Sequence, residues 1–169
     1  MRSLIVLAAL LGATAATAQP QNWRLTPEGY GPVRIGMTRP QVERTLGAAL
    51  RGAGSVEDSS VCIETEARRG HPGITFMFER NRLSRVSAGD GSRATTPRGI
   101  AVGATEAQMR RAYPRGLRSQ AHQYQDEPAR YFDYWVSATR GVRFATDERR
   151  RIQMIHVGNA SIRYVEGCA

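Results

Sequence analysis

Apolar and polar residues alternate in two parts of the chain, a pattern typical of half-buried β-strands. In each part an alternating run, 73–78 or 141–146, is separated by a short polar turn from a second apolar run, 83–88 or 152–157. Strands joined by so short a turn pair with each other in antiparallel fashion. The pattern therefore predicts two antiparallel hairpins, one in each half of the chain.

A repeated motif precedes each hairpin. Segments 33–46 and 100–113 share apolar positions and three identical residue types in the same order. The matched residues are Gly36 with Gly103, Thr38 with Thr105, and Gln41 with Gln108. Thr-x-x-Gln is a capping box, in which the two side chains bond backbone amides at the start of a helix. The motif predicts a turn and a short helix in each half, with caps at Thr38, Gln41, Thr105 and Gln108.

These elements predict an α+β fold with two related halves, each a short capped helix or helix pair packed on an antiparallel sheet. Further strands are expected at 62–65, 131–136 and 162–165. The polar, Gly-rich stretch between the halves is typical of a linker. The predicted division is a first repeat at 19–89, a linker at 90–95 and a second repeat at 96–169.

The string from Gly31 to Val42, followed by Leu46 and Gly47, resembles the opening of small envelope domains of the BamE (SmpA/OmlA) type. In that family an "IGMT…V…LG" segment begins a helix pair that packs on a short antiparallel sheet. A tandem pair of such units is similar to the architecture of the beta-lactamase inhibitor protein. The resemblance implies a repeated helix-on-sheet fold and a binding or inhibitory role in the cell envelope. The lipoprotein cysteine of the BamE group has no counterpart in this chain.

The N-terminus has the pattern of a secretory signal peptide. A basic start is followed by a short apolar run, 4–13, and by an A-x-A cleavage pattern that ends at Ala18. The predicted signal peptide is 1–18. The next residue is Gln19 rather than cysteine, which indicates a protein without a lipid anchor. We expect a periplasmic or secreted protein of bacterial type.

The chain has two cysteines, Cys62 and Cys168. In an oxidising compartment an even pair most simply forms a disulfide. The predicted Cys62–Cys168 bridge would tie the end of the chain to its middle and make the two halves one rigid unit. Two cysteines and three scattered histidines do not make the pattern of a structural zinc site, and no metal or cofactor is expected.

All 24 basic residues are arginine, and the formal net charge is +9. Two interpretations remain open: a coding bias that replaces lysine by arginine, or recognition of an anionic envelope ligand such as lipopolysaccharide or nucleic acid. The arginines are dispersed along the chain, whereas a nucleic-acid groove usually shows a basic stripe with interleaved aromatic residues.

Aromatic residues gather in the second half, and with a neighbouring arginine they have the composition of a protein-binding hot spot. On the expected strand 131–136, residues 131, 133 and 135 share one face and residues 132, 134 and 136 the other. The candidate partner-binding residues are Tyr124, Arg130, Tyr131, Tyr134 and Trp135. A fully buried strand would explain the same composition.

No catalytic motif stands out. His71, His122 and His156 lie in turn, polar and strand contexts, and no nucleophile-elbow, zinc-protease, Walker or Rossmann pattern occurs. We therefore expect an exported, non-catalytic binding protein, for example an inhibitor or an envelope protein-interaction module. The alternative is an arginine-rich binder of an anionic envelope ligand.

Overall fold

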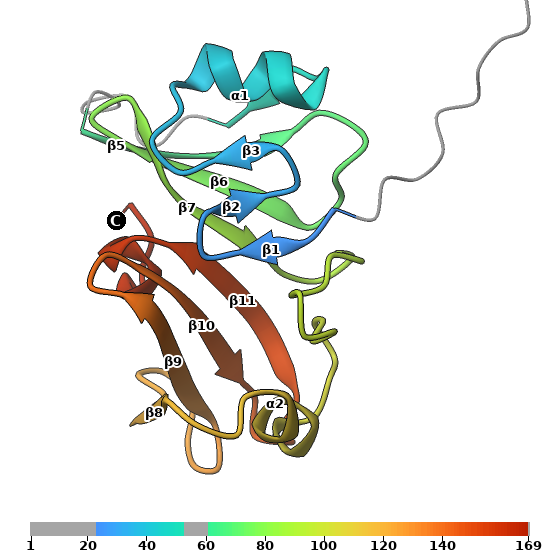
Figure 1. The fold of residues 1–169 in the computed structure, drawn as a ribbon, viewed down its shortest axis with the longest axis vertical. Helices are drawn as coiled ribbons and strands as arrows, with labels where there is room; N and C mark the ends of the chain where they lie inside the picture. The colour runs from blue at the N-terminus through green and yellow to red at the C-terminus, as the bar shows by residue number, and fades with distance from the viewer. Residues whose placement is uncertain (1–22, 53–60, 169) are drawn as a thin grey trace, which may run out of the picture.

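The computed structural model describes residues 23–52 and 61–168 (Figure 1). The predicted signal peptide, 1–18, lies outside the described residues. Within them, none of the helices combines the length and the apolar character needed to cross a bilayer.

One antiparallel sheet of eight strands runs through the molecule (Figure 1). In spatial order its strands are β4 (Leu50–Arg51), β5 (Cys62–Ala67), β6 (Ile74–Glu79), β7 (Arg82–Ala88), β11 (Ile152–Gly158), β10 (Arg140–Thr146), β9 (Arg130–Ser137) and β8 (Leu117–Ala121). The two predicted hairpins are β6–β7 and β10–β11, and both pair as expected. The expected strands at 62–65 and 131–136 correspond to β5 and β9.

The predicted fold class is wrong. Over the described residues the fold is mostly β, with 42% strand and 14% helix, and it does not consist of two helix-on-sheet halves. The physical reason lies at the β7–β11 pair, where Val86 is opposite Val157 and Ala88 is opposite Ile155. An unpaired edge strand exposes backbone donors and acceptors, and here the inner edges of the two hairpins satisfy each other. The strands of both halves therefore form one continuous sheet.

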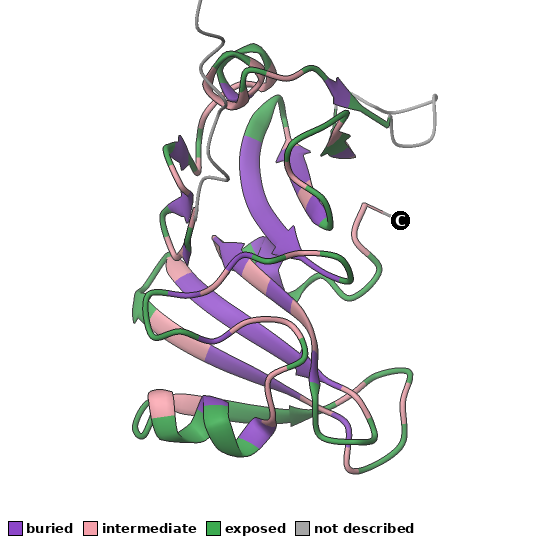
Figure 2. Cartoon of the chain, turned by 90° about the vertical axis from the view of Figure 1, so that its right-hand side faces the viewer, coloured by how far each residue is buried: buried purple, intermediate pink, exposed green. Residues whose placement is uncertain are grey.

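One face of the sheet is covered by small elements (Figures 1 and 2). They are α1 (Arg39–Leu46), α2 (Glu106–Ala112) and a three-stranded sheet of β1 (Leu25–Thr26), β2 (Gly29–Tyr30) and β3 (Val33–Arg34). Val42 of α1 and Met109 of α2 are fully buried and pack into one apolar cluster with Phe76, Phe144 and Ile155 of the large sheet. The core of the protein lies between these elements and the sheet.

Both helices begin at the predicted threonines. The Thr38 amide donates to Gln41 Oε1 at 2.8 Å, and the Thr105 amide donates to Gln108 Oε1 at the same distance. At α2 the Gln108 amide also donates to Thr105 Oγ1 at 3.2 Å. Helix α1 ends at Gly47, whose φ of 64° is a left-handed conformation that glycine adopts at low cost. The sequence therefore defines both helix starts and the end of α1 locally.

The C-terminal segment crosses the opposite face of the sheet, as the view turned by 90° shows (Figure 2). It consists of a 3-10 helix, η1 (Ala160–Arg163), and an irregular stretch to Cys168, which we call the C-terminal strap (residues 160–168). The predicted Cys62–Cys168 disulfide is confirmed. A strand was expected at 162–165, but the side chain of Asn159 accepts from the Ser161 amide at 2.8 Å and starts a helical turn instead.

The segment expected to link the halves contacts the rest of the fold. The Leu25 amide donates to the Thr95 carbonyl at 2.9 Å, and Ala94 is buried in the core cluster. Each helix is followed along the chain by four strands of the large sheet, β4–β7 after α1 and β8–β11 after α2. The division of the chain into two repeats remains a prediction.

Candidate functional site

The face of the sheet beneath the C-terminal strap is polar, and we call it the polar face. Arg143 on β10 donates to both carboxylate oxygens of Asp133 on β9, from Nε at 2.7 Å and from Nη2 at 3.2 Å. Arg163 of the strap donates to the same carboxylate from Nε at 2.8 Å. Charge-assisted and bidentate bonds of this kind are the strong ones in proteins, so the polar face is a rigid ionic network.

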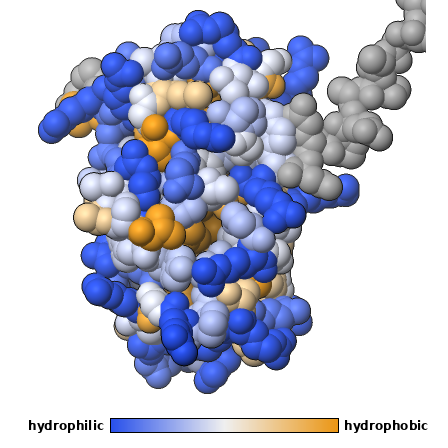
Figure 3. Space-filling model, in the orientation of Figure 1, coloured by the Kyte–Doolittle hydropathy of each residue, from blue (hydrophilic) through white to orange (hydrophobic). Residues whose placement is uncertain are grey.

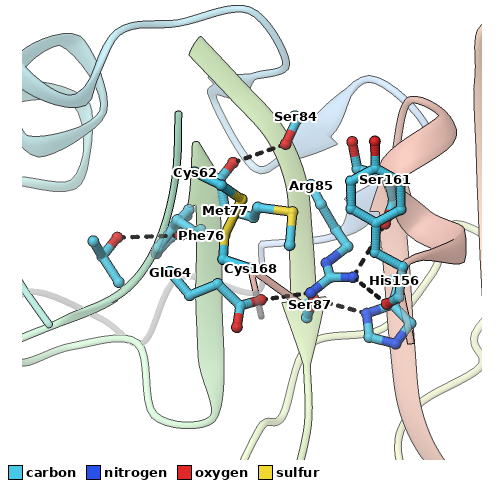
Figure 4. Close-up of polar contacts among 12 residues, drawn as sticks. Cys62, Glu64, Phe76, Met77, Ser84, Arg85, Ser87, His156, Ser161 and Cys168 are labelled. Atoms are coloured by element: carbon cyan, nitrogen blue, oxygen red, sulfur yellow. Dashed lines mark hydrogen bonds and ion pairs between the residues drawn. A yellow bond between two sulfur atoms is a disulfide. The ribbon is translucent and has the colours of Figure 1, made fainter. Parts of the chain in front are cut away.

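A second arginine joins the strap to the sheet (Figure 4). Arg85 on β7 donates from Nη1 to the carbonyls of Ser161 and Tyr164, at 3.1 and 2.8 Å, and from Nη2 to Glu64 at 2.5 Å. Burial lowers the pKa of Arg85, and the Glu64 carboxylate opposes that shift. The Ser161 hydroxyl donates to Glu79. These bonds fix the strap on the polar face independently of the disulfide.

A pocket of about 300 Å³ opens on the polar face beside the strap. Its walls come from the β8–β9 connection, from the central strands β9, β10 and β11, and from the strap. The lining residues are His122, Tyr124, Tyr131, Arg143, Ala145, Gln153, Met154, His156, Ile162, Tyr164 and Val165. Its size is at the lower end of the range for ligand pockets.

Exposed apolar side chains concentrate around this pocket. Tyr124, Tyr164 and Val165, which are 59%, 46% and 36% exposed, all line it, and they are three of the five large hydrophobic residues that are exposed in the described part of the chain. On the face that carries the helices, hydrophobic residues appear in small areas surrounded by hydrophilic ones (Figure 3). Scattered apolar residues are ordinary, whereas a group of them around a pocket is a feature that binding surfaces often have.

The rim at the β8–β9 connection is held by aromatic and amide contacts. His122 stacks on Tyr131 with ring centroids 4.4 Å apart and planes 22° apart. The His122 ring also contacts Gln153 at 3.3 Å, and its Nδ1 accepts from the Tyr124 amide at 3.2 Å. Burial lowers the pKa of His122, which favours the neutral ring. The Tyr124 hydroxyl donates to Glu166 of the strap, which closes the rim.

His156 forms part of the pocket wall and is kept neutral. Its pKa is lowered well below 6.5, first by burial and then by the positive charges of Arg85 and Arg143. Its Nδ1 lies 2.8 Å from the hydroxyl of Ser87 on β7 (Figure 4). A serine paired with an imidazole can be a nucleophile, but Ser87 is only 4% exposed and does not line the pocket. The pair therefore orients the imidazole and does not present a hydroxyl to a substrate.

The structure separates the five predicted partner-binding residues. Tyr124 and Tyr131 line the pocket, and Trp135 lies on the same face of β9 without lining it. Trp135 packs under the Arg163 guanidinium, 5.2 Å from its ring centroid. Tyr134 points to the opposite face, where its hydroxyl accepts from Arg98 at 3.0 Å. Arg130 bonds Ser119 and Glu127.

The sequence interpretation missed most of the pocket wall. The sequence pattern places His156 on a strand without a special role, and it does not distinguish Arg143, Gln153, Tyr164 and Val165 as site residues. The available signal was the placement of polar residues at 143 and 156 within apolar alternation. That placement shows which face of the strand is polar, but not which polar side chains meet.

Comparison with known proteins adds no assignment: no family model, no curated protein and no solved structure matches the chain. The similarity to BamE-type domains remains a prediction. Within the described ranges no three His, Cys, Asp or Glu side chains gather as a metal site would require. The site is therefore characterised by its geometry alone.

Proposed function

We propose that this chain is an exported, non-catalytic binding protein that recognises a protein partner through the pocket on the polar face and its rim. The observation that carries the proposal is the convergence of exposed Tyr124, Tyr164 and Val165 on one pocket. Protein interfaces concentrate their binding free energy in a few large side chains around a well-packed pocket. The Cys62–Cys168 disulfide supports export, since such bonds persist in oxidising compartments.

Rigidity supports a binding role. Asp133, Arg143 and Arg85 use charge-assisted hydrogen bonds to fix the floor of the pocket and the strap beside it. A surface that is already ordered loses less conformational entropy on association. A polyanion binder needs several basic side chains in a row, whereas Arg143 is the one charged residue among the described residues that line this pocket.

Site-specific photo-cross-linking in the producing cell tests the proposal. A photoreactive phenylalanine analogue replaces Tyr124 or Tyr164 at the rim, and in the control it replaces Arg111, an exposed residue of α2 on the opposite side of the sheet. We expect one discrete cross-linked protein from the rim positions and none from position 111. The cross-link should persist at about 0.5 M NaCl, where exposed ion pairs are strongly screened.

Purified partner then allows a quantitative test. The double variant Tyr124→Ala, Val165→Ala should weaken partner binding by about 10- to 100-fold, the range expected for hot-spot truncations. The variant Arg111→Ala should bind as tightly as the unaltered protein. Equal cross-linking from all three positions would contradict the proposed surface. Complete loss of binding in high salt would favour the anionic-ligand alternative instead.

A further inference from the structure

We propose that the pocket on the polar face accepts a single carboxylate, the side chain of an aspartate or glutamate of the partner protein. The inference rests on the proposed function and names the group that enters the pocket. It is based on three residues that line the same small cavity and whose side chains carry hydrogen-bond donors: Arg143, His156 and Tyr131.

The local charge favours an anion. Asp133 is the one carboxylate that Arg143 and Arg163 both contact, so this cluster of three side chains carries one uncompensated positive charge. Arg143 is the only charged residue among the described residues that line the pocket. Glu166 accepts the Tyr124 hydroxyl bond at the rim and is not part of the lining. The depressed pKa of His156 has Arg85 and Arg143 among its causes, which indicates a positive potential at the ring.

The donors also have unused hydrogen-bonding capacity. Arg143 donates three hydrogen bonds, two to Asp133 and one to the Arg163 carbonyl. A guanidinium has five N–H groups, so two of them have no partner among the described residues. His156 uses Nδ1 for Ser87, and among the described residues its Nε2 has no partner. When Nδ1 accepts a hydrogen bond from the Ser87 hydroxyl, the proton of the neutral ring lies on Nε2, which can then donate. The Tyr131 hydroxyl likewise has no partner within the described part of the chain.

The geometry favours a side chain over a larger ligand. A volume of about 300 Å³ accommodates a carboxylate on a short apolar stem. Met154, Ile162 and Val165 supply apolar wall for that stem. One surplus positive charge matches a carboxylate better than a dianionic phosphate. A carboxylate that receives charge-assisted bonds in the pocket also provides specificity, since a neutral analogue would form weaker bonds with the same donors.

Imidazole NMR with small probes tests the inference on the whole protein. The probes are N-acetylglutamate N-methylamide and its glutamine counterpart, and the readout is the ring signals of the three histidines. We expect the glutamate probe to shift His156 and His122 in a saturable way, with the glutamine probe at least about 10-fold weaker. His71 should not move, because it packs on Trp23 and Tyr30 away from the pocket.

A matched pair of variants locates the binding. Tyr131→Phe removes a hydroxyl from the pocket and should weaken the glutamate probe by about 3- to 10-fold, the effect of one lost hydrogen bond. Tyr134→Phe removes the neighbouring hydroxyl on the opposite face of β9 and should leave the affinity unchanged. Both variants keep the aromatic ring, so both should fold.

Three results would overturn the inference: equal binding of the two probes, no shift with either probe, or tighter binding of inorganic phosphate than of the glutamate probe. None of these would affect the rim cross-link, which tests the proposed function separately. The opposite combination of results is also informative. If the glutamate probe binds but the rim positions cross-link to no protein, the carboxylate site is supported and the protein-binding role is contradicted.

Discussion

Arg143 holds Asp133 by two hydrogen bonds across the neighbouring strands β10 and β9, with both side chains at most 3% exposed. The contact lies under the C-terminal strap, which adds a third bond to the same carboxylate through Arg163. A buried ion pair of this kind is strongly destabilising to break from one side, because the remaining charge has no solvent to receive it. This pair therefore anchors both the floor of the pocket and the strap.

Asp133→Asn should be among the most destabilising single changes in the protein. It keeps the shape of the side chain and removes the charge that Arg143 needs, so we expect the free energy of unfolding to fall by about 3–5 kcal/mol. Chemical denaturation of the purified variant measures this loss. The matched control is Arg163→Gln, which removes the partner that is 44% exposed and should cost no more than about 1 kcal/mol. Equal losses in the two variants would contradict the assigned role of Arg143.

Removal of the disulfide should release the strap without abolishing the fold of the sheet. The bridge closes a loop with a sequence separation of 106, and its loss in Cys62→Ser, Cys168→Ser should cost up to about 4–5 kcal/mol in the chain-entropy model. Hydrogen exchange should rise first in the strap, because only side-chain contacts then hold it, such as those of Arg85 with Ser161 and Tyr164 and of Arg163 with Asp133. Uniform loss of protection over all strands would show that the strap and the sheet unfold as one unit.

The helix caps should contribute measurably to the free energy of unfolding. Thr105→Ala should lower the free energy of unfolding by about 0.5–2 kcal/mol, because the Gln108 amide loses Thr105 Oγ1 as its acceptor. Thr38→Ala should fall at the lower end of this range, because the Thr38 hydroxyl donates to Gln41 Oε1 at the cap. Urea denaturation measures both changes. Thr45→Ala is the control: its hydroxyl bonds the Gln41 carbonyl inside α1, and its loss should be within about 0.5 kcal/mol. A cap variant that is as stable as this control would contradict the capping role.

Stability should decrease as the pH falls below the ordinary histidine range. The folded pKa of His156 lies well below 6.5, so between that folded value and 6.5 the unfolded chain binds a proton that the folded protein does not. The contribution of neutral His156 to the free energy of unfolding is therefore complete above about pH 6.5. As the pH decreases below 6.5, this contribution falls by at most about 1.4 kcal/mol per pH unit. His71 and His122 act in the same direction, because burial lowers the pKa of both.

Denaturant unfolding at several pH values between about 5 and 8 checks this dependence. The variant His156→Gln should show a shallower slope than the unaltered protein, since one of the three histidine contributions is absent. Ser87, Arg85 and Arg143 surround the ring, and none of them titrates in this range as an ordinary side chain. Identical slopes in both proteins would exclude His156 as a source of the pH dependence.

The local features could be predicted from the sequence because short stretches determine them. Alternation over a few residues defines β6 and β10, and Thr-x-x-Gln places the start of each helix within one turn. The disulfide was predictable because the chain offers one cysteine pair. The expected strand at 162–165 was wrong because the Asn159 side chain, which the apolar pattern does not reflect, starts a helical turn.

The continuous sheet and the pocket depend on contacts between residues that are far apart in the sequence. Whether two hairpins form separate sheets or one depends on the edges of β7 and β11, and alternation within each strand is the same in both cases. The Ser87–His156 contact joins residues 69 positions apart, and the bond from Arg85 to Ser161 joins residues 76 apart. The sequence by itself determined secondary structure, caps and the disulfide, since local sterics and hydrogen bonds specify them. Only the tertiary structure decided the continuous sheet and the pocket, because distant side chains must meet before their charges and donors can act together.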